Sequence, residues 1–167
     1  MTANDIATQP PGNGVQDYVQ VVSFRLTNED YAIEITTVKE IILVGDVTRV
    51  PQMPAYIEGV INLRGSVIPV LDLRKRLGIP ANPVDENGRI VVVRMADRVI
   101  GLIVDAVNQV MKIPKYKIQV PPDTIACQAG DYLTGIAKLE DRMVMLLAIQ
   151  DVLSETEHSA LAETSLP

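Results

Sequence analysis

Aromatic residues are scarce in this 167-residue sequence, which has no tryptophan, a single phenylalanine and five tyrosines. Proteins that bind single-stranded nucleic acid stack the bases on aromatic side chains. The net charge of −6 would in addition repel a phosphate backbone. Apolar residues make up 47% of the chain, but no uninterrupted run approaches the roughly 20 residues that span a bilayer. The composition therefore predicts no nucleic-acid binding and no direct membrane insertion.

The side chains of common catalytic and metal sites are equally rare. The one cysteine, Cys127, excludes an internal disulfide bond and a zinc site built from cysteines. The one histidine, His158, lies in a polar C-terminal stretch, and no glycine-rich phosphate loop is present. Asp72, Asp105 and Asp131 stand apart in the sequence, which favours capping or turn roles. We therefore expect no enzymatic activity, no cofactor and no metal.

Short strands joined by tight turns dominate the predicted secondary structure. Apolar and polar residues alternate over 16–26 and again over 31–35, as in strands with one buried face. Apolar spacing after residue 35 and the proline-flanked stretch 53–59 each predict a single helical turn. Further hairpins are predicted over 89–104 and 133–147.

The stretch GVINLRGSVIPVLDLRKRLG at residues 59–78 predicts the most sharply defined hairpin. Apolar runs at 60–63 and 67–71 flank Arg64-Gly65, where glycine supplies the positive φ of a tight turn. Asp72 is placed to cap a short helix behind the second strand. Charge patterning favours a solvent-exposed helix face for the basic residues that follow: Arg74, Lys75 and Arg76.

This hairpin has a second copy later in the chain. When residues 57–65 are aligned with residues 133–141, apolar residues match apolar residues and Gly59 matches Gly135. The match continues to residue 153. YAIEITTVKEII at 31–42 aligns with IGLIVDAVNQVM at 100–111, which puts Ile41 on Val110. Two blocks in the same order indicate two copies of one unit.

About five short strands per copy, without long crossover helices, predict an all-β fold of two five-stranded antiparallel barrels with short helices and a C-terminal helix. We expect a disordered tail at 1–16, interleaved barrel subdomains at approximately 17–84 and 85–153, and a second tail at 154–167. The N-terminal residues lack the basic segment and apolar block of a secretion signal, so we expect a cytoplasmic protein. A groove between the barrels is the expected place for a partner or ligand.

Four segments carry a resemblance to a known family: YAIEITTVKEI at 31–41, NLRGSVIPVLDLRKRLG at 62–78, GLIVDAVNQV at 101–110 and YLTGIAKLEDRMVMLLAIQDVL at 132–153. Together they resemble CheW, the family of coupling proteins in bacterial chemotaxis. The resemblance implies a pair of SH3-like barrels that form a scaffold without catalytic activity. It also implies two partners, the cytoplasmic tips of methyl-accepting chemoreceptors and the regulatory domain of the histidine kinase CheA. Such a scaffold is recruited to receptor arrays at the inner face of the membrane.

The same resemblance implies which residues serve these partners. Six match receptor-binding or coupling positions, namely Val38, Glu40, Ile41, Gly59, Arg64 and Val110, and two match positions expected to shape the groove, Gly101 and Gly135. Glu40 and Arg64 have opposite charges and both follow strand ends, so we expect an ion pair that gives Arg64 a defined direction.

The expected mechanism is that of an adaptor. An apolar groove lined by Val38, Ile41 and residues near Val110 accepts one helix of a receptor tip, and the similar barrels of the kinase join one barrel of this chain edge to edge. Two alternatives stay open: a CheW-like scaffold of a non-chemotaxis receptor–kinase pathway, and a double barrel that binds a small ligand or a peptide. Proline-rich peptides usually dock in aromatic-lined grooves, and the absence of tryptophan argues against them.

Overall fold

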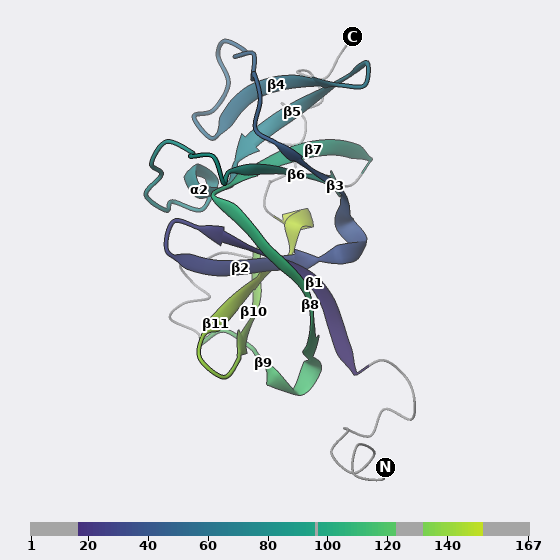
Figure 1. The fold of residues 1–167 in the computed structure, drawn as a ribbon, viewed down its shortest axis with the longest axis vertical. Helices are drawn as coiled ribbons and strands as arrows, with labels where there is room; N and C mark the ends of the chain where they lie inside the picture. The colour runs from purple at the N-terminus through teal and green to yellow at the C-terminus, as the bar shows by residue number, and fades with distance from the viewer. Residues whose placement is uncertain (1–16, 96, 123–131, 152–167) are drawn as a thin grey trace.

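The computed structural model describes residues 17–95, 97–122 and 132–151, which form two β-sheets with a few short helices (Figure 1). The all-β prediction is confirmed. Both expected tails and most of the expected C-terminal helix lie outside the described residues, as do Cys127, Asp131 and His158. The last element that the structure describes is a 3₁₀ turn, η4 (Ile149–Asp151).

Six strands form one sheet, in the order β8 (Ala106–Pro114), β1 (Tyr18–Leu26), β2 (Glu29–Glu34), β11 (Met143–Leu147), β10 (Leu133–Lys138) and β9 (Ile118–Gln119). Five form the other, in the order β3 (Val38–Leu43), β6 (Arg89–Met95), β7 (Arg98–Val104), β5 (Ser66–Asp72) and β4 (Ile57–Leu63). The short helices are η1 (Ile35–Thr37), α2 (Leu73–Arg76) and η2 (Lys115–Lys117). The two sheets lie one above the other in Figure 1.

Each sheet curls so that the chain leaving one edge strand reaches the opposite edge. β8 continues through η2 into β9, which pairs with β10. After β3, the backbone of Thr48 pairs with Val60 of β4 through hydrogen bonds of 2.9 and 2.8 Å. Each sheet therefore forms a small barrel of five strands when β8 and β9 are counted as one bent strand, in agreement with the predicted SH3-like architecture.

The two sequence repeats exchange strands. The first copy places β1 and β2 in the six-stranded sheet and β3, β4 and β5 in the five-stranded sheet, and the second copy does the reverse. The barrels therefore do not coincide with the approximate bounds of the predicted interleaved subdomains, 17–84 and 85–153, which correspond to the two sequence repeats. The chain crosses between the sheets after β2 and again after β7. It does so because β3 pairs with β6 of the second copy, and β8 pairs with β1 of the first copy.

Strand register confirms the predicted alignment of the repeats residue by residue. Val70 of β5 pairs with Gly101 of β7, where these two strands run parallel. Leu146, the counterpart of Val70, pairs with Ala32, the counterpart of Gly101. Both copies also have a β-bulge at the same place, just before Gly59 in β4 and just before Gly135 in β10. The duplication is thus a property of the backbone as well as of the sequence.

Two predicted helical turns differ from the structure. The turn expected after residue 35 is η1, but the residues from Val38 onward form β3 because they pair with β6. The stretch 53–59 contains turns and then the start of β4 at Ile57, without a helix. The predicted hairpins at β4–β5, β6–β7 and β10–β11 are confirmed.

One cluster of buried apolar residues spans both barrels, and each barrel also has a smaller cluster of its own. The six-stranded sheet contributes Phe24, Leu26, Ile33, Leu133 and Leu147, and the five-stranded sheet contributes Leu71, Val91, Val93, Met95, Ile100 and Leu102. Complete burial of one such side chain stabilises the fold by about 1.5–3 kcal/mol relative to exposure. The space between the barrels, where the sequence predicted a groove, is therefore filled by buried side chains.

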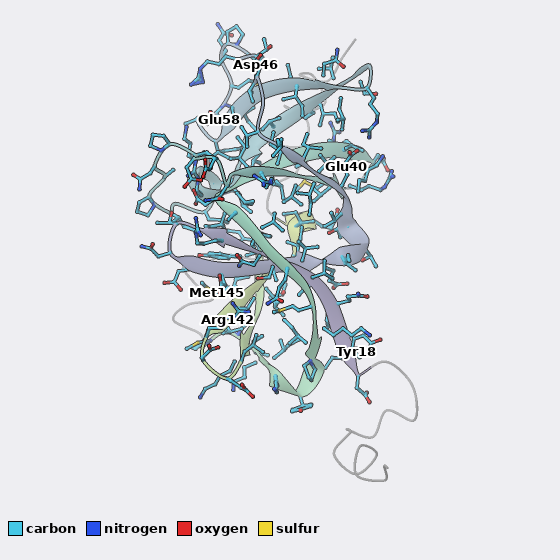
Figure 2. All side chains as sticks on the ribbon, in the orientation of Figure 1. Tyr18, Glu40, Asp46, Glu58, Arg142 and Met145 are labelled. Atoms are coloured by element: carbon cyan, nitrogen blue, oxygen red, sulfur yellow. The ribbon has the colours of Figure 1, made fainter. Side chains whose placement is uncertain are left out.

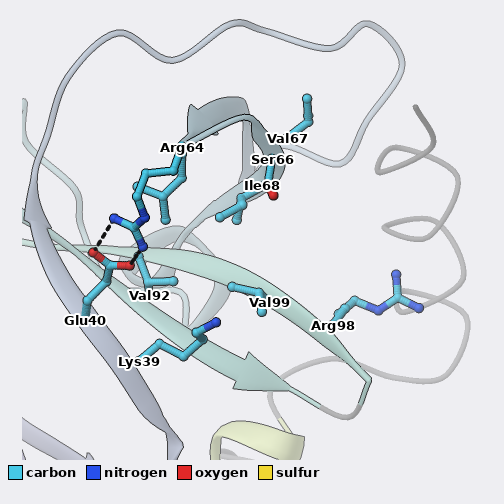
Figure 3. Close-up of a pocket in the computed structure, with 10 residues that line it drawn as sticks. Lys39, Glu40, Arg64, Ser66, Val67, Ile68, Val92, Arg98 and Val99 are labelled. Carbon is cyan, nitrogen blue, oxygen red and sulfur yellow. Dashed lines mark hydrogen bonds and ion pairs between the residues drawn. The ribbon is translucent and has the colours of Figure 1, made fainter.

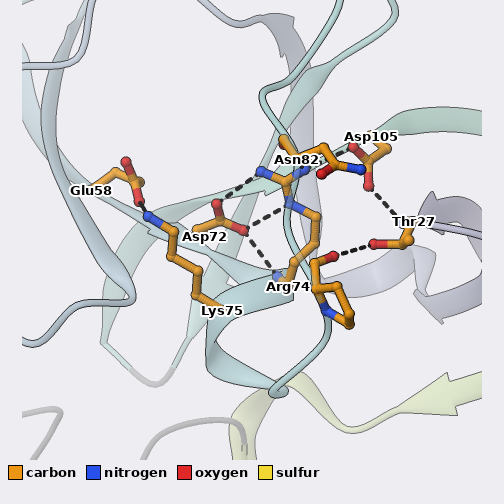
Figure 4. Close-up of polar contacts among 8 residues, drawn as sticks. Thr27, Glu58, Asp72, Arg74, Lys75, Asn82 and Asp105 are labelled. Atoms are coloured by element: carbon orange, nitrogen blue, oxygen red, sulfur yellow. Dashed lines mark hydrogen bonds and ion pairs between the residues drawn. The ribbon is translucent and has the colours of Figure 1, made fainter.

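Arg74 links the barrels through a buried polar cluster (Figure 4). Its Nε and Nη2 donate to the two oxygens of Asp72 at 3.1 and 2.9 Å, and its Nη1 donates to Asp105 at 2.9 Å and to the carbonyl of Asn82 at 2.7 Å. The other oxygen of Asp105 accepts from the backbone N–H of Thr27, in the β1–β2 turn, at 2.6 Å. The cluster therefore joins α2 to the crossover after β7 and to the other barrel.

Two expectations about these residues are corrected. The Arg74 side chain is only 4% exposed, so the three basic residues do not form one solvated face. Asp72 does cap α2, accepting from the backbone N–H of Arg74 at 3.0 Å, but Asp72 and Asp105 meet on the same guanidinium. The hydrogen bonds that Arg74 donates to Asp72 in particular raise the pKa of Arg74, which stays charged although burial opposes this.

Arg74→Ala should lower the free energy of unfolding by about 3 kcal/mol, because it leaves two carboxylates without their buried partner. Lys75→Ala is the matched control. Lys75 is 41% exposed and pairs with Glu58 on the surface, so its loss should cost less than about 1 kcal/mol. Urea unfolding of both variants measures the difference, and equal costs would show that the cluster contributes no more than a surface ion pair.

Candidate functional site

Arg64 stands at the tip of the β4–β5 hairpin in a strained backbone conformation. Arg64 has φ 51° and Gly65 has φ 89°, which is the geometry of a two-residue type I′ turn. The backbone N–H of Gly65 donates to Oδ1 of Asn62 at 2.9 Å and fixes the turn. Asparagine, aspartate or glycine normally fills the position of Arg64, and another residue there costs on the order of 1 kcal/mol. The arginine is thus kept at a position where its backbone is unfavourable.

The expected ion pair between Arg64 and Glu40 is present (Figure 3). Nη1 of Arg64 donates to Oε1 of Glu40 at 3.1 Å, and Nη2 donates to Oε2 in a second, parallel hydrogen bond. Hydrogen bonding to Arg64 lowers the pKa of Glu40, and the same bond raises the pKa of Arg64. A two-point contact of this kind sets the plane of the guanidinium, which a lysine could not do.

The Arg64 side chain is held by Glu40 but remains 69% exposed. A guanidinium has five N–H donors, and the pair with Glu40 uses two of them. The other three have no hydrogen-bond partner among residues 17–95, 97–122 and 132–151. Arg64 therefore presents oriented, unused donors to the solvent.

An open hollow of about 390 Å³ lies beside this pair on the five-stranded barrel (Figure 3). The cations on it are Lys39, Arg64 and Arg98, and Glu40 is its one acid. Val67, which is 48% exposed, and Val99 give it an apolar part. A surface with oriented donors, excess positive charge and exposed aliphatic side chains is suited to binding an acidic, partly apolar protein segment.

Nothing in this hollow points to catalysis. Its lining has no nucleophile paired with a base, and no aromatic side chain. Across the parts of the chain that the structure describes, no three histidine, cysteine, aspartate or glutamate residues gather in a way that would hold a metal ion.

The structure brings together two of the expected coupling residues and separates the others from them. Val38 is half-buried and packs against the core shared by the barrels. Ile41 is 38% exposed on β3, and Val110 is 51% exposed on β8 of the other sheet, where it pairs with Val22. None of these three lines the hollow at Glu40 and Arg64. Their part in receptor binding stays a prediction.

Close packing explains why glycine occupies positions 59, 101 and 135. A Cβ on Gly59, which has φ 149°, would lie 2.0 Å from the carbonyl oxygen of Thr48. A Cβ on Gly101 would lie 2.7 Å from Cγ2 of Ile90, and one on Gly135 would lie 2.7 Å from Cγ2 of Ile118. Each glycine thus lets a barrel close around it, and any further part in shaping a partner surface stays a prediction.

Sequence reasoning missed Lys39, Val67 and Arg98 as parts of the site. Val67 sits in the quoted hairpin next to the turn, so its proximity to Arg64 was available from the strand pairing. Lys39 adjoins Glu40 in the sequence. Arg98 had no such signal, because it begins β7 and reaches the hollow only through the order of strands in the sheet.

Comparison with known proteins places this chain in one family. A family model described as a CheW-like domain matches residues 20–157. The chain belongs to the CheW-like family. A chemotaxis protein CheW from Klebsiella aerogenes is 38% identical over 134 residues, covering 80% of this chain and 81% of that protein. A chemotaxis protein CheW from Bacillus subtilis is 35% identical over 145 residues, covering 86% and 93%.

The CheW-like fold also appears in a solved structure. The crystal structure of the scaffolding protein TtCheW from Thermoanaerobacter tengcongensis matches with a TM-score of 0.75 at 34% identity, covering 84% of this chain and 95% of that one. The resemblance predicted from the sequence is confirmed. Proteins of the CheW family are non-catalytic scaffolds, so this chain is not an enzyme.

No helix within the described residues is both long and apolar enough to cross a membrane.

Gly59→Ala should destabilise the protein by about 3 kcal/mol, since it combines an unfavourable φ with a backbone clash. Gly45→Ala is the control, because a Cβ on Gly45 meets no atom within 4 Å. Thermal or urea unfolding measures both. If Gly59→Ala is as stable as the unsubstituted protein, any loss of function at this position is a direct loss of contact and the packing argument is wrong.

Glu40 should titrate below its ordinary pKa of 4.5 in the folded protein. A lowered pKa means that the carboxylate stabilises the fold above its ordinary pKa, and that this contribution is lost as the pH falls through the lowered value. Arg64→Ala should move the pKa of Glu40 back upward. NMR titration of the Glu40 carboxyl carbon in both proteins tests this, and an identical pKa in the two would show that the ion pair is absent in solution.

Proposed function

We propose that this protein is a non-catalytic adaptor that couples the cytoplasmic tips of chemoreceptors to the histidine kinase CheA in chemotaxis arrays. It would act in the cytoplasm, at the inner face of the membrane. The relatives named above are chemotaxis and scaffolding proteins, which supports the broad class. The specific coupling is our inference for this chain.

One observation supports the proposal most strongly: the guanidinium of Arg64 is held by Glu40 with three donors directed to solvent. An ion pair that is open to solvent contributes little to stability, while the backbone of Arg64 is in an unfavourable conformation. The fold therefore gains little or nothing from an arginine here. A binding partner that accepts hydrogen bonds from Arg64 would account for it.

The exposed apolar residues extend the surface that a partner could cover. Ile41, Leu43 and Val44 lie along and just after β3 and are 38%, 68% and 36% exposed. β3 is an edge strand of the five-stranded sheet, and it also carries Glu40. We propose that the receptor helix contacts the Glu40–Arg64 pair and that a kinase barrel packs edge to edge with this chain.

The alternatives are a scaffold in a receptor–kinase pathway outside chemotaxis and a double barrel that binds a small ligand or peptide. The hollow has no aromatic side chain, which disfavours proline-rich peptides. A scaffold of another pathway would keep the same fold and the same ion pair. It would be recognised by the failure to activate CheA with any receptor fragment while another receptor–kinase pair responds.

Arg64→Ala should keep the fold but reduce receptor-controlled CheA activity at least about tenfold in a reconstituted mixture of receptor fragments, kinase and this protein, as expected when charge-assisted contacts worth 1.5–3 kcal/mol are lost. Arg142→Ala is the matched control. It removes another partly exposed arginine, paired with Asp30, on the other barrel (Figure 2), and it should couple normally. Normal coupling by Arg64→Ala would contradict the proposal, and an unfolded Arg64→Ala protein would show that Arg64 is structural.

A further inference from the structure

We infer that the acidic C-terminal segment of this chain, residues 152–167, docks on the basic hollow at Arg64 and Arg98 and competes there with the partner segment. This inference deepens the proposed function by naming a regulator of the same site. The docking itself does not depend on which partner the hollow serves, whereas the competition does.

The last described turn of the chain contacts β6, a strand that also contributes to the hollow. Nε2 of Gln150 donates to the backbone carbonyl of Arg94, on β6, at 3.1 Å. Arg94 pairs with Val99 across the β6–β7 hairpin, and Met95 pairs with Arg98. Val99 and Arg98 both line the hollow. The last described turn is therefore joined to a strand that contributes to the hollow, and the 16 residues after Asp151 can extend on the order of 50 Å.

The charges of the segment and the hollow are complementary. Residues 152–167 contain three acids, Glu155, Glu157 and Glu163, and no lysine or arginine. The hollow has three cations against one acid, and that acid, Glu40, is already paired with Arg64. Attraction between a segment of net charge −3 and a hollow with unpaired cations favours docking, more so at low ionic strength.

Arg98 supplies a second, independent sign of a missing partner. Its Nε is buried, yet it has no hydrogen-bond partner among residues 17–95, 97–122 and 132–151. A buried donor without an acceptor loses its hydrogen bonds to water and gains none in return, so native proteins rarely leave one in that state. Arg98 extends from the edge of the hollow in Figure 3. A glutamate of the C-terminal segment is the acceptor that the chain itself can bring to this place.

Apolar residues of the segment match the remaining part of the hollow. Val152 and Leu153 come first, and Leu161 follows Glu157 by four residues. Exposed Val67 and half-buried Val99 offer them an aliphatic surface. A segment that combines acids with aliphatic side chains has the chemistry that the hollow was argued to accept from a partner, so the two would compete.

Docking is tested on this protein alone, without receptor or kinase. A synthetic peptide of residues 152–167 is added to the chain truncated after Asp151, and backbone and Arg Nε–Hε signals are followed by NMR. We expect saturable shifts at Lys39, Arg64, Arg98 and Val99 that weaken with added salt. No shifts, or shifts confined to the six-stranded barrel, would overturn the inference.

Three controls keep the test decisive. A peptide with Glu155, Glu157 and Glu163 all changed to Gln should bind at least about fivefold more weakly if charge drives docking. Arg98→Gln should weaken binding of the original peptide, whereas Arg49→Gln, at an exposed arginine outside the hollow, should not. If the truncated chain does not fold, the full chain is compared with its own three-glutamine version, and unchanged Arg64 and Arg98 signals would overturn the inference.

The competition is tested separately, by the affinity of a receptor fragment for the full chain and for its three-glutamine version. If the segment occupies the hollow about 90% of the time, docking that is about fivefold weaker should tighten receptor binding about fourfold. Equal affinities together with confirmed docking would overturn the competition but not the docking. Absence of receptor binding by both chains would instead contradict the proposed function.

Discussion

The structure depends on one constraint: neither repeat can complete a barrel from its own strands. β3 of the first copy pairs with β6 of the second, and β8 of the second pairs with β1 of the first. Without these partners, β3 and β8 would each have a row of unpaired backbone N–H and C=O groups, and such groups are costly to bury. The shared apolar core and the candidate site both follow from this exchange. Glu40, from the first copy, is held in place by Val92 of the second.

The buried cluster around Arg74 makes the exchange specific. Apolar packing between the barrels is non-directional, whereas Arg74 must meet Asp72, Asp105 and the Asn82 carbonyl at the same time. Asp105 occupies the crossover between β7 and β8, and its contact with Thr27 reaches the other barrel. A buried ion cluster is weak evidence of extra stability. Its directional bonds instead fix where the chain passes from one sheet to the other.

Duplication supplied a common skeleton, and the polar surface then differs between the copies. The counterparts of Glu40 and Arg64 in the second copy are Gln109 and Glu140, which cannot form the same ion pair. The counterpart residues nevertheless keep their register, since Gln109 pairs with Ser23 as Glu40 pairs with Val92. The two barrels therefore offer different surfaces on nearly the same backbone, which suits a scaffold that must hold unlike partners.

The sequence by itself determined the strands, the hairpins, the duplication and its register, because apolar alternation and turn residues act over short distances. It also indicated the Glu40–Arg64 pair. It led us to expect interleaved subdomains, but it did not indicate which strands the repeats exchange, that Arg74 is buried, or that Arg98 reaches the hollow. Those outcomes depend on contacts between residues far apart in the chain, such as Arg74 and Asp105, which are 31 positions apart. Such contacts are decided by the order of strands in the closed barrels. That order is selected because it buries the apolar residues of both repeats together, whereas the local sequence of either repeat is compatible with several strand pairings.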